Sequence, residues 1–276
     1  MSRLPSQMPA EPVMSTAKIL ASEQVSPSFQ RVTVGGAGLG GYQWRGFDQW
    51  FRLFLPAPGA DLTLPTVSGR AWFRSYLSIP KDRRPHCANY TAADFRPDGA
   101  APEMDINVVL HWDHDGKLGG RVAEWAVSAE VGSPLGLLDQ GVMFNPPPQT
   151  GSFLLVAEQT GLPAVRGILR DLPANARGTA VIELPTEQDV AWFTSSVTIP
   201  AEMSIHCVYP QSPGDTPGAA ALAKLQTLPA PEPDAYAFIV GESHLAAGGR
   251  RTLRRLGLDK DRICFKGFWR HHPHKP

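Results

Sequence analysis

The stretch of sequence that decides the fold runs from Phe153 to Leu172. It opens with the apolar run Phe153-Leu-Leu-Val156, continues through the loop Ala157-Glu-Gln-Thr-Gly-Leu-Pro163, and then places apolar residues at helical spacing. Pro163 falls in the first turn of the expected helix, where a missing N–H costs nothing. A buried strand followed at once by an amphipathic helix is the repeating unit of a parallel α/β sheet.

The same alternation continues towards the end of the chain. Further strand-like runs occupy residues 180–184, 205–209, 236–240 and 263–265. A second helix is expected from about Ala246 to Leu256, with Gly257 as the residue that ends it. We therefore expect residues 151–276 to form an α/β domain with a parallel sheet.

The first half of the chain has a different pattern. Short runs rich in β-branched and aromatic residues at 29–34, 49–55 and 106–111 are separated by Gly, Pro and Asp-rich turns, which predicts an antiparallel barrel or sandwich. One helix is expected from about Arg121 to Ala129. The triple proline at 146–148 marks a domain boundary at 146–151. We expect a disordered N-terminus over residues 1–20 and a β-barrel domain over residues 21–146.

Composition narrows the classes of function. The chain has 276 residues, is 42% hydrophobic and 19% charged, and carries a formal net charge of zero, so it offers nucleic acid no general attraction. No run approaches the ~18 apolar residues of a membrane-spanning helix. Cys87, Cys207 and Cys264 are widely spaced, which argues against a disulfide framework or a zinc knuckle. No secretory signal is evident, so we expect a cytoplasmic protein with neither nucleic acid nor membrane as its partner.

Two features of the α/β half are candidate nucleotide contacts. The loop that contains Thr160 and Gly161 lies between a strand and a helix, where open parallel sheets bind phosphate, although a plain connecting turn explains it equally well. Glu183, near the end of the next strand, could accept a hydrogen bond from a nucleotide ribose, which would favour NADH over NADPH. A solvated carboxylate is the competing interpretation.

Candidate sites in the first half are weaker when each is taken alone. Tyr90-Thr91 could face a flavin ring and reach its edge, but such a pair is also common in strand packing. His111, Asp113, His114 and Asp115 include metal-ligating residue types, yet a strand that runs into an Asp-Gly turn explains them better. We therefore predict no metal site.

Charge gathers at the C-terminus. From Arg250 onward there are nine basic residues and two acidic ones, a local excess of seven in a neutral chain. Part of this excess is the solvated face of a helix. Lys266 and Arg270 lie beyond that helix and flank Gly267-Phe-Trp269, so we expect them to contact an anionic ligand. His271, His272 and His274 are interpreted as a solvated terminus.

Taken together, these residues resemble the siderophore-interacting proteins, flavin-dependent ferric-siderophore reductases of the ferredoxin reductase-like superfamily. The resemblance spans about residues 25 to 270, and its specificity comes from the order and spacing of several segments. These are Val25-Ser-Pro-Ser-Phe-Gln-Arg-Val-Thr-Val34, Arg84-Pro85 with Tyr90-Thr91, Asp105-Ile-Asn-Val-Val-Leu-His111, Trp125-Ala126 after paired glycines, Ala157-Glu-Gln-Thr-Gly-Leu-Pro-Ala164 and Lys266-Gly-Phe-Trp-Arg270.

The resemblance implies a flavin-binding barrel followed by a domain for the nicotinamide nucleotide. It implies that Tyr90 stacks on the isoalloxazine, that Thr91 reaches its N5 edge, and that the helix start at Gly120–Ala123 holds the FAD pyrophosphate. The remaining residues that we expect to contact the cofactors FAD and NAD(P)H are His111, Arg121, Val122, Trp125, Thr160, Gly161, Glu183 and Trp269. We expect Arg262, Lys266 and Arg270 to contact the anionic substrate.

The sequence departs from the family pattern at two positions. The family usually has Arg two residues before the Tyr and often another two residues after it, whereas this chain has Ala88 and Ala93. Arg121 stands where the family usually has a smaller residue. The expected function is the FAD-dependent reduction of ferric siderophores by a monomer, with NAD(P)H or ferredoxin as electron donor. The alternatives are a flavin-poor siderophore-binding protein and an NAD(P)H:flavin oxidoreductase with another acceptor.

Overall fold

The computed structural model describes residues 9, 12–66, 69, 71–112, 116–212 and 214–272. The chain divides into two compact units, an N-terminal domain over residues 7–142 and a C-terminal domain from Met143 onward. This division falls a few residues before the proline-rich boundary expected at 146–151. No helix among the described residues is both long enough and apolar enough to cross a membrane.

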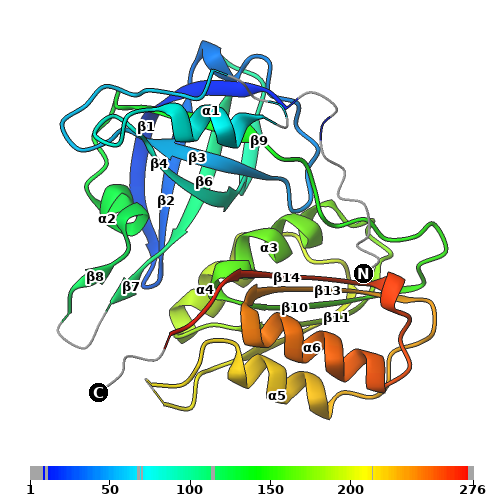
Figure 1. Ribbon diagram of the computed structural model, residues 1–276. Helices are drawn as coiled ribbons and strands as arrows, with labels where there is room; N and C mark the ends of the chain where they lie inside the picture. The colour runs from blue at the N-terminus through cyan, green and yellow to red at the C-terminus, as the bar shows by residue number, and fades with distance from the viewer. Residues whose placement is uncertain are drawn as a thin grey trace. The chain divides into compact units, whose positions relative to one another are not determined.

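The N-terminal domain is built on an antiparallel sheet, as expected. Its seven described strands follow the order β4-β3-β9-β1-β2-β6-β5, so β4 and β5 are the outer strands of the hydrogen-bonded ladder (Figure 1). The strands are β1 (Met14–Ser26), β2 (Phe29–Gly35), β3 (Trp50–Leu55), β4 (His86–Thr91), β5 (Asp94–Arg96), β6 (Glu103–Val109) and β9 (Pro134–Asp139).

The first strand corrects one expectation. β1 includes residues 14–20, so their assignment to a disordered N-terminus is wrong. Ser15, Ala17 and Ile19 are buried in alternation, and β1 pairs with both β2 and β9. Serine, alanine and lysine have weak strand preferences, and they conceal the period of two that the burial pattern reveals.

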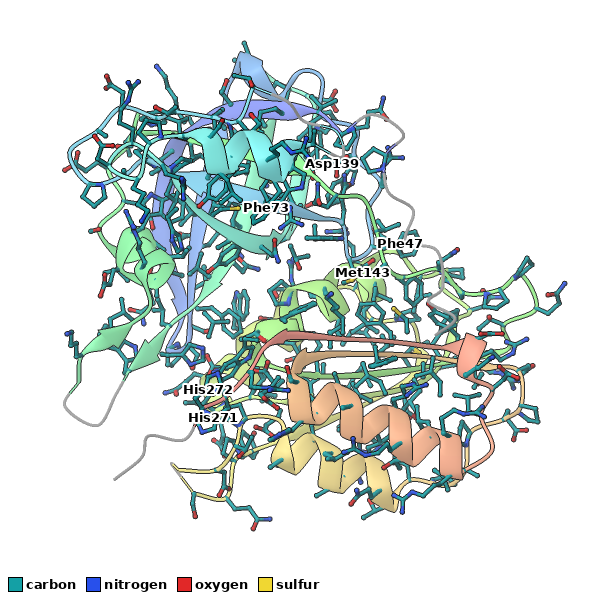
Figure 2. All side chains as sticks on the ribbon, in the orientation of Figure 1. Phe47, Phe73, Asp139, Met143, His271 and His272 are labelled. Atoms are coloured by element: carbon teal, nitrogen blue, oxygen red, sulfur yellow. The ribbon has the colours of Figure 1, made fainter. Side chains whose placement is uncertain are left out.

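Two short helices and a small hairpin accompany this sheet. They are α1 (Trp72–Ser78), α2 (Arg121–Val127), the 3-10 turn η1 (Ala37–Leu39), and the hairpin of β7 (His111–Trp112) with β8 (Leu118–Gly119). The sequence predicted α2 but not α1, which has no buried residue and no side-chain N-cap. Its aromatic rings hold it in place, because Trp72 and Tyr76 lie 6.2 and 6.1 Å from the ring of Phe54. Phe73 of α1 is 53% exposed (Figure 2).

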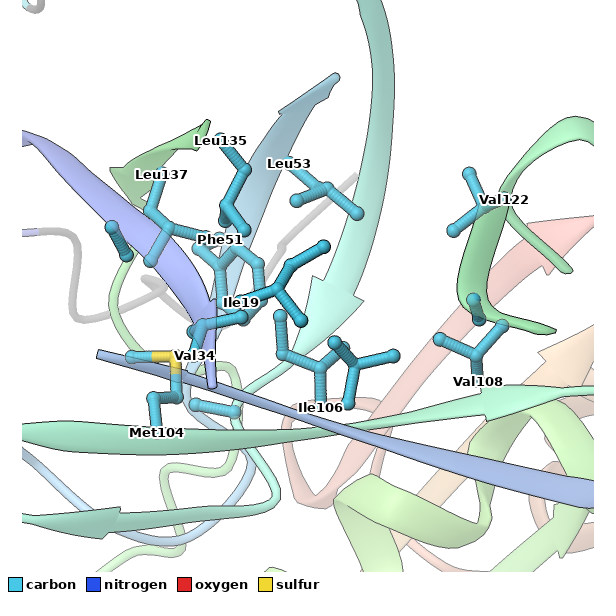
Figure 3. Close-up of a cluster of buried hydrophobic side chains, with 14 of the residues drawn as sticks. Ile19, Val34, Phe51, Leu53, Met104, Ile106, Val108, Val122, Leu135 and Leu137 are labelled. Atoms are coloured by element: carbon cyan, nitrogen blue, oxygen red, sulfur yellow. The ribbon is translucent and has the colours of Figure 1, made fainter. Parts of the chain in front are cut away.

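The core of the N-terminal domain forms where the inward faces of its strands meet α2. Ile19, Phe51, Ile106 and Leu137 come from four different strands, and Val122 comes from α2 (Figure 3). Burial of such side chains contributes about 1.5–3 kcal/mol each. This packing fixes the position of α2 relative to the sheet.

The C-terminal domain has the expected parallel sheet, with the described strand order β12-β11-β10-β13-β14 (Figure 1). Every pairing is parallel. The strands are β10 (Ser152–Glu158), β11 (Arg177–Glu183), β12 (Glu202–Val208), β13 (Ala235–Glu242) and β14 (Ile263–Trp269).

Helices cover both faces of this parallel sheet, with α3 and α4 on one face and α5 and α6 on the other (Figure 1). They are α3 (Leu162–Asp171), α4 (Glu187–Ser195), α5 (Ala219–Thr227) and α6 (Ser243–Arg255), with the 3-10 turns η2 (Gln159–Gly161) and η3 (Lys260–Arg262). The strand order reverses between β10 and β13. In such sheets ligands bind outside the carboxyl ends of the strands at this reversal.

Candidate functional site

The strand β4 presents the first group of candidate residues at the edge of the N-terminal sheet. Because side chains alternate along a strand, His86, Ala88 and Tyr90 share one face. Ala88 and Tyr90 are partly buried and pack against the core, where they pair across the ladder with Leu53 and Phe51. Burial raises the pKa of Tyr90 far above its ordinary value, so its hydroxyl stays protonated. The ring therefore supplies a flat, uncharged surface.

The next two positions that the family pattern involves are more buried. Thr91 is 8% exposed and ends β4. Ala93 is 1% exposed, and its N–H donates to the carbonyl of Asp105 at 2.9 Å. The usual second arginine could not occupy position 93 of this backbone without displacing the core. Ala88 is less buried than Ala93.

Arg121 acts electrostatically on this same strand. It is the first residue of α2 and is exposed, and it makes no hydrogen bond or ion pair with any other described residue. Its positive charge is felt at His86, whose pKa is lowered mainly by burial and further by Arg121. The same charge opposes the effect of burial on the pKa of Tyr76. Arg121 therefore offers an exposed guanidinium without a partner among the described residues, and its charge reaches His86 on the face of β4 that carries Ala88.

The other predicted residues of α2 have a structural role through their side chains. Val122 and Ala123 are buried, and Trp125 packs against the core. Gly120, with φ at 95°, adopts a conformation that favours glycine at the entry to the helix. Only backbone N–H groups of this turn could face a cofactor, together with the side chain of Arg121.

The histidine pattern is only partly described. His111 is exposed and opens β7, where it pairs with Gly119. Asp113, His114 and Asp115 lie outside the described residues, as does His274. In the parts of the chain that the structure describes, no three His, Cys, Asp or Glu side chains gather closely enough to hold a metal ion.

The second group of candidate residues lies at the carboxyl ends of β10 and β14. Glu158 ends β10, is 1% exposed, and accepts hydrogen bonds from the backbone N–H of Thr160 at 3.0 Å and from its hydroxyl. The indole N–H of Trp269 donates to the same carboxylate at 3.2 Å. Thr160 and Trp269, two predicted cofactor residues far apart in sequence, thus share one partner.

Gly161 has a packing role that the sequence did not reveal. A Cβ at this position would lie 2.8 Å from Cγ2 and 2.9 Å from the carbonyl of Val240. The glycine lets η2 and the start of α3 approach β13 closely. The predicted loop is therefore a tight 3-10 turn held against the sheet.

Glu183 does not have either of the roles considered for it. It is 4% exposed rather than solvated, and its two oxygens accept the N–H groups of Gly218 at 2.7 Å and Ala221 at 3.0 Å. It therefore caps α5 at the start of the helix, where a carboxylate also favours the helix dipole. The structure gives no support to a ribose contact or to the preference for NADH that would follow from it, because the carboxylate is buried and bound to the start of α5.

The basic residues of the C-terminal segment separate into two places. Arg262 precedes β14 and donates to the carbonyl of Asp234 at 2.9 Å. Lys266 and Arg270 are exposed further along, towards the carboxyl end of the sheet. The seven residues of β14 span about 23 Å. The structure therefore does not bring Arg262 together with Arg270.

Solved structures place the two domains in a known class. A ferredoxin reductase in carbazole 1,9a-dioxygenase matches with a TM-score of 0.64 and 16% identity, covering 94% of this chain and 71% of that chain. The siderophore-interacting protein SipS from Aeromonas hydrophila matches with a TM-score of 0.73 and 26% identity, covering 95% of this chain and 93% of that chain. The fold is that of the ferredoxin reductase-like proteins.

Sequence comparison narrows the class to one family. The siderophore-interacting FAD-binding domain matches residues 18–143, and the siderophore-interacting protein domain matches residues 150–272. The NADPH-dependent ferric-chelate reductase of Escherichia coli is 26% identical over 253 residues, which cover 91% of each chain. The ferric vibriobactin reductase ViuB of Vibrio cholerae is 26% identical over 254 residues, 89% of this chain and 85% of that protein. The chain belongs to the siderophore-interacting protein family.

Proposed function

We propose that this protein is an FAD-dependent reductase of ferric siderophores with NAD(P)H as electron donor. The observation that carries the proposal is that one chain matches both family domains, and that the ferric-chelate reductase of E. coli matches it across both. One NAD(P)H reduces two Fe(III) to two Fe(II) and yields NAD(P)⁺ and one proton. Iron is released because Fe(II) binds the hard oxygen ligands of the chelate more weakly than Fe(III).

The residues of the N-terminal domain fit the cofactor. Tyr90 supplies a flat neutral face at an outer strand, Thr91 a hydroxyl beside it, and Arg121 an exposed positive charge for a pyrophosphate. The N–H groups from Gly120 to Ala123 add donors to the same phosphate contact. Bound FAD would supply the conversion of a two-electron hydride donor into single electrons, which NAD(P)H alone does not provide.

The C-terminal domain would supply the nucleotide contacts and the substrate contacts. The turn at Thr160 lies at the reversal of strand order, which favours the nucleotide. Lys266 and Arg270 are exposed cations that suit an anionic ferric chelate. Arg262 is left out of this proposed contact because of its place at the opposite end of β14. Ferredoxin as an alternative donor, a monomeric state and a cytoplasmic location are parts of the same proposal.

Anaerobic turnover tests the proposed function. The protein is loaded with FAD and mixed with NADPH or NADH and a ferric hydroxamate or catecholate, and Fe(II) is trapped by a chromogenic ferrous chelator. Fe(II) should form only with protein, FAD and reductant present together. Reduced ferredoxin in place of NAD(P)H tests the other donor. Fe(II) formation that does not need the protein would refute the assignment.

A second candidate function rests on Ala88. The absence of an arginine at this position removes a phosphate contact, which suits a protein that binds the ferric siderophore without flavin. Such a protein would bind the chelate without any response to FAD, and quenching of its tryptophan fluorescence would measure that binding. An NAD(P)H:flavin oxidoreductase would instead consume NAD(P)H with FAD present and leave Fe(III) chelates unreduced.

A further inference from the structure

The buried carboxylate of Glu158 joins two segments that the proposed function uses separately. Its Oε2 accepts the backbone N–H of Thr160 at 3.0 Å, and its Oε1 accepts the hydroxyl of Thr160 and the indole N–H of Trp269, the latter at 3.2 Å. Thr160 belongs to the turn assigned to the nucleotide. Trp269 directly precedes Arg270, which is assigned to the anionic chelate.

A glycine makes this connection possible. Glu158 ends β10 and Trp269 ends β14, and β13 lies between these two strands. A Cβ at Gly241 of β13 would lie 2.6 Å from Oε1 of Glu158. Gly241 also has φ at 126°, which other residues rarely adopt. The carboxylate therefore reaches across the middle strand only because position 241 has no side chain.

The end of β14 is held on both sides of Arg270. The hydroxyl of Ser243 donates to the carbonyl of Trp269 at 2.7 Å, and the N–H of His271 donates to the carboxylate of Glu242 at 3.0 Å. Glu242 is itself fully buried and also accepts the N–H of His244. His271 and His272 follow the end of this strand (Figure 2). The backbone on either side of Arg270 is thus fixed while its side chain is exposed.

Burial of the carboxylate of Glu158 costs desolvation free energy. Burial raises its pKa, the hydrogen bonds from Thr160 and Trp269 lower it, and the negative charge of Glu183 raises it again. Among the described residues no lysine or arginine forms an ion pair with it. An apolar side chain would fill this space as well, so packing does not explain a carboxylate here. The carboxylate is explained by the geometry that it imposes on its three donors.

We propose that Glu158 is a positioning residue that couples the turn at Thr160 to the Trp269–Arg270 segment. A nucleotide that settles on the turn changes the bonds that Thr160 makes with Glu158, and the shared carboxylate passes this change to the indole of Trp269. Arg270 is then held in place for an anionic ferric chelate when the reductant is bound. This inference rests on the proposed function, because it needs a nucleotide at the turn.

The indole N–H of Trp269 is the direct reporter. In a ¹H–¹⁵N correlation spectrum of the ¹⁵N-labelled full chain its resonance is identified by its loss in Trp269→Phe. Glu158→Gln retains the size of the side chain but replaces one accepting oxygen with an NH₂ donor, so at least one of the three donors loses its acceptor. We expect the Trp269 resonance to move in Glu158→Gln. We also expect NADP⁺ to move it in the wild-type protein and to move it far less in the variant.

Glu183→Gln is the matched control, since Glu183 is a buried carboxylate that ends the neighbouring strand and caps α5 instead. It should lower the thermal midpoint and move the Trp269 resonance far less than Glu158→Gln does, because Glu183 acts on Glu158 only through its charge. An equal displacement of that resonance by Glu183→Gln, or none by Glu158→Gln, would overturn the proposal. If Glu158→Gln does not fold, Trp269→Phe removes the same hydrogen bond by deleting its donor. It should shift the backbone amide of Thr160 and weaken NADP⁺ binding about tenfold, and an unchanged affinity would count against the coupling.

Calorimetry of NADP⁺ binding distinguishes a failure of the coupling from a failure of the proposed function. If NADP⁺ binds the wild-type protein and the Trp269 resonance does not respond, the coupling is wrong and the proposed function stands. If NADP⁺ and NAD⁺ do not bind at all, the nucleotide site of the proposed function fails, and the coupling fails with it. Steady-state kinetics at saturating NADPH add a further test. Under these conditions the KM for the ferric chelate should rise more in Glu158→Gln than in Glu183→Gln.

Discussion

We predict that Arg121 replaces the phosphate contact that Ala88 lacks. An arginine on β4 would supply a forked pair of hydrogen bonds to the pyrophosphate of FAD. In this chain the strand offers a methyl group, while the guanidinium of Arg121 lies close enough to lower the pKa of His86, after the larger effect of burial. Arg121→Ala should therefore weaken FAD binding, and Ala88→Arg should strengthen it.

The size of the effect follows from the kind of contact. A hydrogen bond to a charged group contributes about 1.5–3 kcal/mol, and 2 kcal/mol corresponds to about a thirtyfold change in affinity. With one such contact in place of the usual pair, wild-type FAD affinity should fall in the micromolar range. Arg121→Ala should then weaken it about thirtyfold, and Ala88→Arg should strengthen it by a similar factor. Ala93→Arg should instead destabilise the domain, because position 93 is 1% exposed.

Titration of apo-protein with FAD, followed by flavin fluorescence, measures these changes. Riboflavin has no phosphate, so its affinity should not change in Arg121→Ala, and this comparison separates a phosphate contact from misfolding. Arg251→Ala removes an equal charge from an exposed position on α6 and should have no effect. An unchanged ratio of FAD to riboflavin affinity in Arg121→Ala would refute the contact between Arg121 and the pyrophosphate. FAD binding by neither the wild type nor Ala88→Arg would refute it as well.

Three further predictions concern other parts of the molecule. Lys266→Ala and Arg270→Ala should raise the KM for an anionic ferric siderophore, with a smaller effect at higher salt, and a KM unchanged at low salt would contradict their role. Gly161→Ala should lower the free energy of unfolding of the C-terminal domain by about 1–3 kcal/mol, because its Cβ would meet Val240; an unchanged melting curve would count against this close packing. Burial acts to raise the pKa of Asp105, but hydrogen bonds from Arg96 and Thr33 and nearby positive charge outweigh it and lower the pKa. Asp105→Asn should therefore lower the free energy of unfolding by about 1–2 kcal/mol at neutral pH. In denaturant unfolding this difference should vanish as the pH falls through and below about 4. A difference that persists in acid would contradict the role of the ion pair.

The five described strands after residue 150 and the helices α3 and α6 could be predicted because local pattern dominates there, whereas α4 and α5 were not predicted. Buried parallel strands such as β13 are continuously apolar, and α3 has a clear helical period. The strand β1 and the helix α1 could not be predicted in this way. β1 is stabilised by pairing with partners distant in sequence, and α1 by aromatic contacts with Phe54, and neither kind of contact leaves a local pattern.

The site residues divide in a similar way. The sequence indicated Tyr90, Thr160 and Trp269 from their place in a motif, but it gave no sign that Glu158 connects the last two. A buried glutamate at a strand end is indistinguishable in sequence from a solvated one, and Glu183 was misinterpreted for the same reason. The cap that each glutamate forms is visible only once the strand order is known.

The most direct test of the central claim is an anaerobic half-reaction in a stopped-flow instrument. Protein loaded with FAD is first reduced with one equivalent of NADPH and then mixed with an excess of a ferric siderophore. We predict that the long-wavelength absorption band of the flavin returns and that two Fe(II) form for each flavin, at a rate that depends on the chelate concentration. A flavin that NADPH reduces but the ferric chelate fails to reoxidise would contradict the account.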